Sequence, residues 1–320
     1  MDSLKNIQSR TDLSPSEKDS RIEISRNILR LKEERNAIIL AHNYQRDEIQ
    51  DIADLSGDSL QLAKYATQVN RDVIVLCGVR FMAESAVILN PSKTVLLPVR
   101  EAGCPMADMI TAEDLRKLKA ANPDAAVVCY VNTSADVKAE SDICCTSSNA
   151  IKIVNSVKQD KVIFVPDRNL GRWVEKHTRK KMIIWQGYCL VHHFINGAEI
   201  FKAKEKHPHA KVIAHPECIE EVLDIADEVC STQGMLEYVR KSNSKEFIIV
   251  TETGIFYKMR KDNPDKKFYY PSENLVCANM KVTRLPQLLN ALEKMVHKVT
   301  IESDISERAK RALDNMLNAS

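Results

Sequence analysis

The chain contains 320 residues, of which 44% are hydrophobic and 28% charged, and its formal net charge is +2. This composition is ordinary for a globular protein with an adequate core, and it excludes the strongly basic surface of a nucleic-acid-binding or membrane-surface protein. The apolar runs are no longer than strands, the N-terminal segment is polar, and the nine cysteines are an odd number, so we expect a cytoplasmic protein with no membrane span, secretory signal or disulfide scaffold.

The N-terminal part of the chain leads into the first strand. Residues 1–20 are polar and we expect them to be loosely ordered, whereas residues 21–36 have apolar positions at helical spacing. Short apolar runs follow, each bounded by polar or turn-forming residues, which is typical of buried parallel strands. The first four strands are expected at residues 38–41, 54–57, 73–77 and 94–98.

The stretch over residues 38–65, IILAHNYQRDEIQDIADLSGDSLQLAKY, occurs three times in altered form. Its second and third copies begin at Val127 and Val212, and each copy joins an apolar run, a polar tip and a Ser/Thr element that opens a helix. The strand–helix–strand segment that begins at Val73 recurs from Val162 and from Phe247. The sequence therefore predicts a triplication with a period of roughly 85–88 residues.

Strands that alternate with short helices predict parallel sheets covered by helices on both faces. We expect an α/β protein of three pseudo-threefold-related, three-layer α/β/α domains with short parallel sheets around a central active site. The expected parts are residues 1–108 (N-terminal segment and first repeat), 109–194 (second repeat), 195–292 (third repeat) and 293–320 (a C-terminal helical tail). Ligands of such sheets bind beyond the carboxyl ends of the strands, where the polar tips lie.

Three cysteines occupy the same place in the repeats. Cys104, Cys189 and Cys277 each lie just past the last strand of a repeat, 85 and 88 residues apart. The simplest interpretation is that they are small buried hydrophobic residues, the common role of a free cysteine. Their matching positions also fit a metal centre: no CxxC pair gives a zinc-finger spacing, and a 4Fe–4S cluster on three cysteines would leave one iron open. Spacing alone leaves both interpretations open.

Histidines and a glutamate at or near strand ends are further candidates. His42, His192 and His215 can be hydrogen-bonded structural residues or part of a site. Glu217 follows His215 by two residues, and a glutamate at the rim of a cleft can act as an acid or base. We expect burial to raise the pKa of Glu217 toward a value useful at neutral pH.

The Ser/Thr elements also have two interpretations. Ser59, Ser147 and Thr232 lie where helices are expected to begin, and capping alone would explain them. Helix N-termini also bind anions, so three of them around one cleft would favour a substrate with carboxylates or a phosphate.

Several longer motifs together resemble the quinolinate synthase family. They are AHNYQ with GDSLQLA, GVRFMAESAVILNP, GCPMA, YVNTSADVKAESD with CTSSNA, PDRNLG, HPEC, VTETG and CANMK, in the family's order. The resemblance covers residues 36–292, nearly the whole chain. Leu190, where the family frequently has proline, and Val250, where it usually has glycine, are small departures that touch no expected ligand.

The resemblance implies a 4Fe–4S cluster with one open iron, held by Cys104, Cys189 and Cys277. It implies condensation of iminoaspartate with dihydroxyacetone phosphate to quinolinate, phosphate and two waters, in NAD biosynthesis, and a functional link to an enzyme that produces iminoaspartate. The substrate-binding residues that it implies are His42, Ser59, Tyr130, Asn132, Ser147, His192, His215, Glu217 and Thr232. The catalytic residues that we expect are Tyr44, Glu217, His215 and Tyr130, with Tyr44 and Glu217 favoured for proton transfer.

Two other functions use the same cysteines. One is a different Fe–S dehydratase that acts on another hydroxy acid. The other is a non-catalytic cytosolic Fe–S or redox sensor, which would need an output surface such as a basic recognition helix, and the sequence offers none. Analysis of the product separates these functions.

Overall fold

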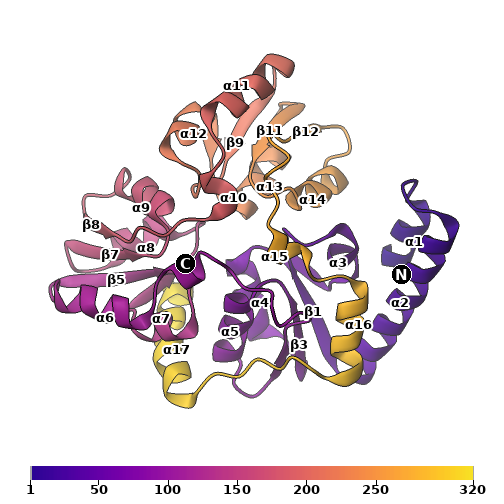
Figure 1. Cartoon of the computed structure of the whole chain (residues 1–320), viewed down its shortest axis with the longest axis horizontal. Helices are drawn as coiled ribbons and strands as arrows, with labels where there is room; N and C mark the ends of the chain where they lie inside the picture. The colour runs from indigo at the N-terminus through magenta and orange to yellow at the C-terminus, as the bar shows by residue number, and fades with distance from the viewer. Residues whose placement is uncertain (1, 320) are drawn as a thin grey trace. The chain divides into compact units, whose positions relative to one another are not determined.

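The computed structural model describes residues 2–319 and contains three parallel four-stranded sheets (Figure 1). The first sheet consists of β1 (Ala37–His42), β2 (Leu55–Gly57), β3 (Val73–Cys77) and β4 (Thr94–Leu96). The second consists of β5 (Ala125–Tyr130), β6 (Ile143–Cys145), β7 (Lys161–Val165) and β8 (Lys181–Ile184). The third consists of β9 (Lys211–Ala214), β10 (Glu228–Val229), β11 (Glu246–Val250) and β12 (Lys267–Tyr269).

The three sheets share one topology, which confirms the predicted triplication. Their strand orders are β2-β1-β3-β4, β6-β5-β7-β8 and β10-β9-β11-β12, so the first strand of each repeat always lies between the second and the third. Helices flank every sheet, as expected of the predicted α/β class. The four strands expected in the first repeat are confirmed, and each of their ends lies within two residues of the expected position.

One aspartate fixes the register at the same place in each sheet. The carboxylates of Asp54, Asp142 and Asp227 accept hydrogen bonds of 2.9, 2.7 and 2.8 Å from strand amides fifteen residues earlier in the chain. The donors are the backbone N–H groups of Ile39, Val127 and Val212, and each of these residues also accepts a hydrogen bond from the aspartate's own N–H.

The chain forms two compact units. The first comprises Met1–Gly103 and Ala278–Ile301, and the second comprises Cys104–Cys277 and Glu302–Ser320. The helices of the first unit are α1 (Asp2–Ser9), α2 (Pro15–Glu34), α3 (Asp47–Ile52), α4 (Ser59–Gln68), α5 (Arg80–Leu89), α15 (Ala278–Lys281) and α16 (Leu285–Lys294). Its core joins α2 and α16 to the first sheet through Ile28, Ile39, Val75 and Leu288, all fully buried.

The second unit contains the second and third sheets. Its α-helices are α6 (Ala112–Ala120), α7 (Ala135–Ala139), α8 (Ala150–Ser156), α9 (Arg168–Glu175), α10 (Leu190–His193), α11 (Gly197–Lys206), α12 (Glu220–Ile225), α13 (Thr232–Lys241), α14 (Ile255–Asp262) and α17 (Ser303–Ala319), and a short 3₁₀ turn spans Ala107–Met109. The predicted boundaries of the three repeats and of the C-terminal tail stay predictions.

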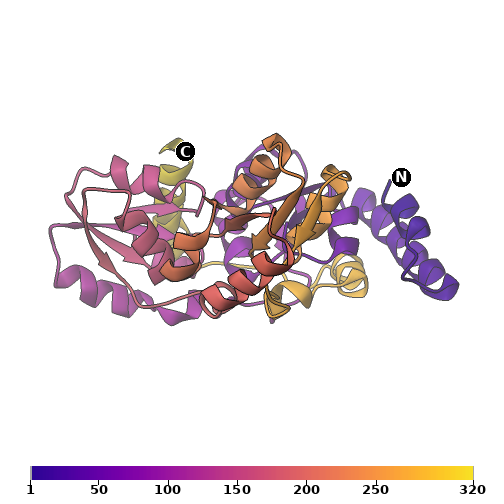
Figure 2. The same cartoon turned by 90° about the horizontal axis from the view of Figure 1, so that it is seen from above.

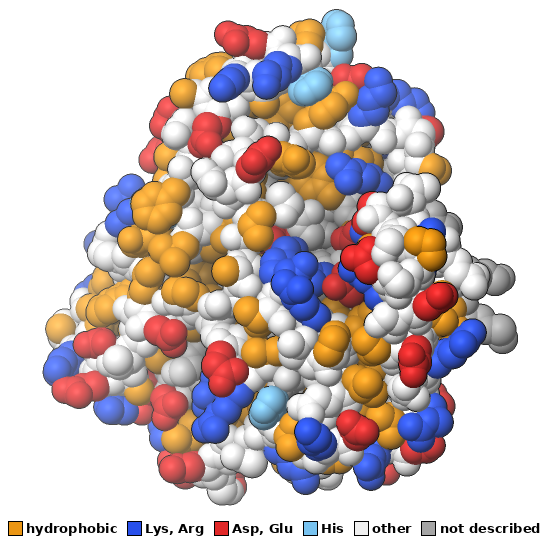
Figure 3. Space-filling model, turned by 45° about the vertical axis from the view of Figure 1, so that its right-hand side comes forward, with side chains coloured by type: hydrophobic (Ala, Val, Ile, Leu, Met, Phe, Trp, Pro, Cys, Tyr) orange, Lys and Arg blue, Asp and Glu red, His pale blue; other side chains and the backbone are white. Residues whose placement is uncertain are grey.

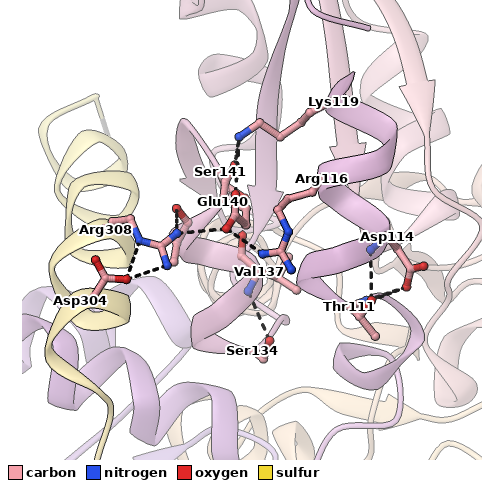
Figure 4. Close-up of polar contacts among 11 residues, drawn as sticks. Thr111, Asp114, Arg116, Lys119, Ser134, Val137, Glu140, Ser141, Asp304 and Arg308 are labelled. Atoms are coloured by element: carbon pink, nitrogen blue, oxygen red, sulfur yellow. Dashed lines mark hydrogen bonds and ion pairs between the residues drawn. The ribbon is translucent and has the colours of Figure 1, made fainter. Parts of the chain in front are cut away.

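The C-terminal helix α17 packs on α7 and β6 of the second sheet, and Figure 2 also draws it against this sheet. A charged cluster around Glu140 fastens it there (Figure 4). Oε1 of Glu140 lies 3.0 Å from a guanidinium nitrogen of Arg116 on α6 and 3.0 Å from one of Arg308 on α17. These contacts outweigh the effect of partial burial and lower the pKa of the Glu140 carboxyl.

The expectation that residues 1–20 are loosely ordered was wrong for most of this segment. Residues 2–9 form α1, and α2 begins at Pro15, six residues earlier than the predicted helix. Ser14 caps α2: its side chain accepts from the backbone N–H of Glu17, while the Glu17 carboxylate accepts from the N–H of Ser14. This capping box, followed by proline at the first turn, is a local helix-start signal that outweighs the polar composition.

Acidic and basic side chains are interspersed over the face drawn in Figure 3, with apolar side chains between them. Of the helices that the structure describes, none combines the length and apolar character needed to cross a membrane.

Candidate active site and metal centre

In the second unit, the strand ends of the second and third sheets bring polar side chains together. Tyr130 is the last residue of β5, and Glu217 lies three residues beyond the end of β9. The Tyr130 hydroxyl donates a 2.6 Å hydrogen bond to Oε1 of Glu217, and both residues are buried. The prediction that ligand-type residues gather at the carboxyl ends of parallel strands is confirmed for this pair.

Two histidines surround the same carboxylate. His192 Nδ1 lies 2.7 Å from Oε2 of Glu217, and its Nε2 lies 2.8 Å from the hydroxyl oxygen of Thr251, which follows β11. The His215 ring stacks on the His192 ring at 4.7 Å, and His215 Nδ1 accepts a hydrogen bond from the backbone N–H of Glu217. Asn169 donates to the backbone carbonyl of Glu217 at 2.9 Å, so the residue is held on both its side chain and its main chain.

The expectation that burial raises the pKa of Glu217 was wrong. Burial does disfavour the ionised carboxylate, but His215 and His192, together with the Tyr130 hydroxyl, stabilise it more and lower the pKa to about 2. Glu217 is therefore an ionised hydrogen-bond acceptor at neutral pH.

The three repeat-equivalent cysteines occupy structurally equivalent connectors. In each repeat, one backbone hydrogen bond joins the connector to the segment where the preceding helix begins. The acceptor is the carbonyl two residues before the cysteine. The donor is the N–H three residues past the end of the repeat's third strand. The bonds are Arg80 N–H to Ala102 O (2.8 Å), Arg168 N–H to Gly187 O (2.8 Å) and Thr253 N–H to Leu275 O (2.9 Å). The sequence argument from spacing thus has a counterpart in three-dimensional structure.

All three thiols lie in the second unit, and Cys104 interacts electrostatically with both Cys277 and Cys189. Burial raises the pKa of Cys104 to about 12, and the neighbouring charges of Cys277 and Glu217 add to this rise. Burial also raises the pKa of Cys189, with Glu217 and Cys104 contributing. Cys189 Sγ lies 3.2 Å from His192 Nδ1, and the ligand-type atoms of Cys189, His192 and Glu217 all lie within 4.8 Å of one another. This donor set suits a metal ion or an iron–sulfur cluster, because thiolates are the usual ligands of iron–sulfur clusters and bound iron would compensate the crowded negative charge.

Asn132, Ser147 and Thr232 are the other predicted substrate ligands in this unit. Asn132 Oδ1 is buried and has no hydrogen-bond partner within the described part of the chain, which leaves an acceptor open at the strand end. Ser147 is half-buried and lies two residues before the N-cap of α8, while Thr232 is the first residue of α13 and is capped by Ser231.

His42, Tyr44 and Ser59 belong to the first unit. His42 ends β1 and accepts a hydrogen bond on Nδ1 from the Tyr44 N–H at 3.1 Å, the same arrangement as that of His215 and Glu217. Ser59 begins α4, whose N-cap Asp58 forms a capping box with Gln61. That these residues share a cavity with those of the second unit stays a prediction.

A family model described as NadA, quinolinate synthetase A protein, matches residues 26–318. Curated proteins named quinolinate synthase from Methanoregula boonei and Geobacter metallireducens are 55% and 56% identical over 294 residues, and one from Methanosarcina barkeri is 55% identical over 295 residues. Each alignment covers 92% of this chain and 97% of the relative. The chain belongs to the quinolinate synthase family.

Membership of the quinolinate synthase family confirms the resemblance inferred from the motifs, and this is a family of enzymes. Two residues that contact this network, Thr251 and Asn169, were not among the residues expected from the sequence. Thr251 directly follows the third strand β11, and Asn169 is the second residue of α9. The strand-end rule that selected the tips of the first strands would have selected Thr251 too, had it been applied to the third strands.

Proposed function

We propose that this chain is a quinolinate synthase that condenses iminoaspartate with dihydroxyacetone phosphate, giving quinolinate, phosphate and two waters. The observation that carries the proposal is the group of three repeat-equivalent cysteines beside the network of Tyr130, Glu217 and His192. Membership of the family supports the same reaction, since the relatives named above are quinolinate synthases.

We infer that Cys104, Cys189 and Cys277 hold a 4Fe–4S cluster. Their connectors share one backbone hydrogen-bonding arrangement, and Cys104 lies close enough to Cys189 and Cys277 for their charges to affect one another. With three protein ligands, such a cluster supplies one open iron that acts as a Lewis acid toward a substrate hydroxyl or carboxylate.

The protein's own groups position and hold protons around that site. Glu217, ionised, keeps the Tyr130 phenol and the His192 ring in fixed orientations, and Thr251 fixes the far nitrogen of the same ring. A carboxylate with a pKa of about 2 is a weak base, so Glu217 serves the Tyr130 hydroxyl and the neighbouring imidazoles as a hydrogen-bond acceptor while they exchange protons with substrate. Tyr44 and His215 are the remaining candidates for proton transfer.

Anionic groups of the substrates are assigned to the Ser/Thr elements. Ser59 and Thr232 begin helices of ten residues each, so free N–H groups and positive dipole ends accompany their hydroxyls, and Ser147 precedes α8. Asn132, His42, His192 and His215 complete the proposed set of substrate-binding residues. The phosphate and carboxylates of the two substrates are the ligands that such groups favour.

The same proposal places the protein in the cytoplasm, in NAD biosynthesis, and in functional connection with an enzyme that produces iminoaspartate. Iminoaspartate is an unstable imine, so a source of it must act alongside this chain.

Product analysis tests the function. Anaerobically prepared protein is incubated with dihydroxyacetone phosphate and with iminoaspartate formed in place from oxaloacetate and ammonia, and quinolinate and phosphate are measured. We expect both products in equal amounts and only when both substrates are present. Dehydration of another hydroxy acid, without quinolinate, would identify a different Fe–S dehydratase, and a loaded cluster with no turnover would favour a sensor.

A further inference from the structure

Two buried acidic residues, Asp167 and Glu252, each accept a hydrogen bond from the backbone N–H of a cysteine. Asp167 is fully buried, two residues past the end of β7. Its Oδ1 accepts from the backbone N–H of Leu170 at 2.7 Å, and its Oδ2 accepts from the backbone N–H of Cys189 at 3.2 Å. One side chain therefore joins the first turn of α9 to the residue that carries the thiol.

Glu252 repeats this arrangement in the third sheet. It lies two residues past the end of β11 and is 1% exposed. Its Oε2 accepts from the backbone N–H of Gly254 at 2.7 Å, and its Oε1 accepts from the backbone N–H of Cys277 at 3.1 Å. Asp167 and Glu252 thus occupy equivalent positions in two repeats, although their side chains differ in length. Each accepts one hydrogen bond from the N–H of a nearby residue two or three positions later and one from the N–H of a cysteine.

We propose that Asp167 and Glu252 are positioning residues that hold Cys189 and Cys277, through their backbone amides, in the arrangement that binds the cluster. The inference rests on the proposed function, because it assumes that these thiols are cluster ligands. A carboxylate has two oxygens and can bind two N–H groups at once, so it fixes a connector relative to a helix without occupying the sulfur. Groups that orient metal ligands in this way are worth about 10- to 100-fold in metal affinity.

The connector of Cys189 is also packed tightly against the segment after β7 that contains Pro166 and Asp167. A Cβ atom at Gly187 would lie 2.6 Å from the backbone oxygen of Pro166, closer than real Cβ atoms come, so only glycine fits there. Gly187 accepts the hydrogen bond from Arg168 and pairs with Asp167 in an isolated parallel bridge. The close approach brings the Cys189 amide within reach of the carboxylate.

The first repeat differs. Val79 occupies the position two residues past β3, so the residue equivalent to Asp167 and Glu252 has no carboxylate. The Cys104 backbone carbonyl instead accepts a 2.9 Å hydrogen bond from the backbone N–H of Ala107. The proposal therefore concerns two of the three ligands and gives no role to Val79.

The test compares Asp167→Asn and Glu252→Gln with Asp142→Asn and Asp227→Asn. All four variants replace an acidic side chain that accepts hydrogen bonds from backbone N–H groups. In the two controls the donors are strand amides, those of Val127 and Val212, and not the amide of a cysteine. The four proteins and the wild type are loaded anaerobically, and iron release to a chelator is timed. The electron paramagnetic resonance spectrum of each reduced cluster and the thermal unfolding of each apoprotein are recorded as well.

We expect iron release to be about tenfold or more faster in Asp167→Asn and Glu252→Gln, with an altered resonance spectrum. Release from the two control variants should stay within about twofold of the wild type, even where their apoproteins melt earlier. Wild-type release rates and spectra in both Asp167→Asn and Glu252→Gln would overturn the proposal, as would equal acceleration in the controls. If Asp167→Asn unfolds the apoprotein, Glu252→Gln decides alone. A wild-type protein that takes up no cluster would instead contradict the proposed cofactor, so the two failures are distinguishable.

Discussion

The Tyr130 hydroxyl donates a 2.6 Å hydrogen bond to Oε1 of Glu217, although the two residues are 87 positions apart in the chain. The contact joins the end of the first strand of the second repeat to the segment after the first strand of the third. His192 approaches the other oxygen of the same carboxylate at 2.7 Å. Two donors thus converge on one buried anion, and the consequences of this convergence can be measured.

Glu217→Gln should lower turnover by a factor on the order of 10² or more, because the groups that Glu217 orients, the Tyr130 hydroxyl and the His192 ring, would lose the usual contribution of positioned acid–base groups. Tyr130 and His192 contact different oxygens of Glu217, and in glutamine one of these two acceptors becomes an NH2 donor, so both contacts cannot be kept. The cluster content and the binding of dihydroxyacetone phosphate should stay normal, which steady-state kinetics and an iron assay check. Turnover close to that of the wild type would reduce Glu217 to a binding residue and leave Tyr44 as the leading candidate.

Tyr130→Phe removes only the hydroxyl that Glu217 accepts. The buried carboxylate would lose a hydrogen bond of the charged kind, which typically contributes about 1.5–3 kcal/mol. We expect a lower free energy of unfolding of the loaded protein and slower turnover, measured by denaturant unfolding and by product formation. Unchanged stability together with unchanged turnover would show that the 2.6 Å contact has neither a structural nor a catalytic role.

Serine substitutions should separate ligand cysteines from cysteines of the core. Cys104→Ser, Cys189→Ser and Cys277→Ser are each expected to abolish the intact cluster and activity. Cys77→Ser and Cys230→Ser should cost stability alone, about 1 kcal/mol or somewhat more at Cys77, which is fully buried in a strand, and less at Cys230, which is half-buried. Loss of the cluster from Cys77→Ser, with retention in Cys104→Ser, would contradict the assignment.

The attachment of α17 should depend on pH through Glu140. The pKa of this carboxyl is lowered because Arg116 and Arg308 outweigh its partial burial. The ionised carboxyl therefore stabilises the folded protein at pH values above its unfolded-state pKa of about 4.3. This stabilisation is lost as the pH falls through the folded-state pKa. Glu140→Gln should therefore destabilise the protein by about 1 kcal/mol or less at neutral pH, since the pairs are partly exposed. Below a pH of about 4 the difference should shrink.

Urea unfolding of the wild type and Glu140→Gln at neutral and acidic pH measures this effect. Glu113→Gln is the matched control, because Glu113 forms only an exposed pair with Lys117 on α6. A destabilisation by Glu140→Gln that is the same at both pH values would rule out the ion pairs as its cause.

Much of the fold was predictable because the same pattern of strands and helices occurs in each of the three repeats. Three apolar runs ending at Ala41, Tyr130 and Ala214 indicated the central strands, and the sheets have one strand order. The equivalence of the three cysteines was also readable from spacing, and the matching connector hydrogen bonds now support it.

The electrostatic state of Glu217 was not predictable in the same way. Its pKa depends on whether burial or the partners dominate, and the partners His192 and Tyr130 are 25 and 87 residues away in the sequence. Asp167 and Glu252 were missed because an acidic residue after a strand is ordinary in sequence. Only the structure shows that both are buried against the amides of Cys189 and Cys277.

The central claim is that three repeat-equivalent cysteines form one cluster site, and metal analysis of the protein purified without oxygen tests it most directly. Iron, zinc and acid-labile sulfide are measured per chain, together with the absorbance spectrum. We expect a brown protein with about four irons and about four sulfides per chain. Stoichiometric zinc with no labile sulfide would contradict it.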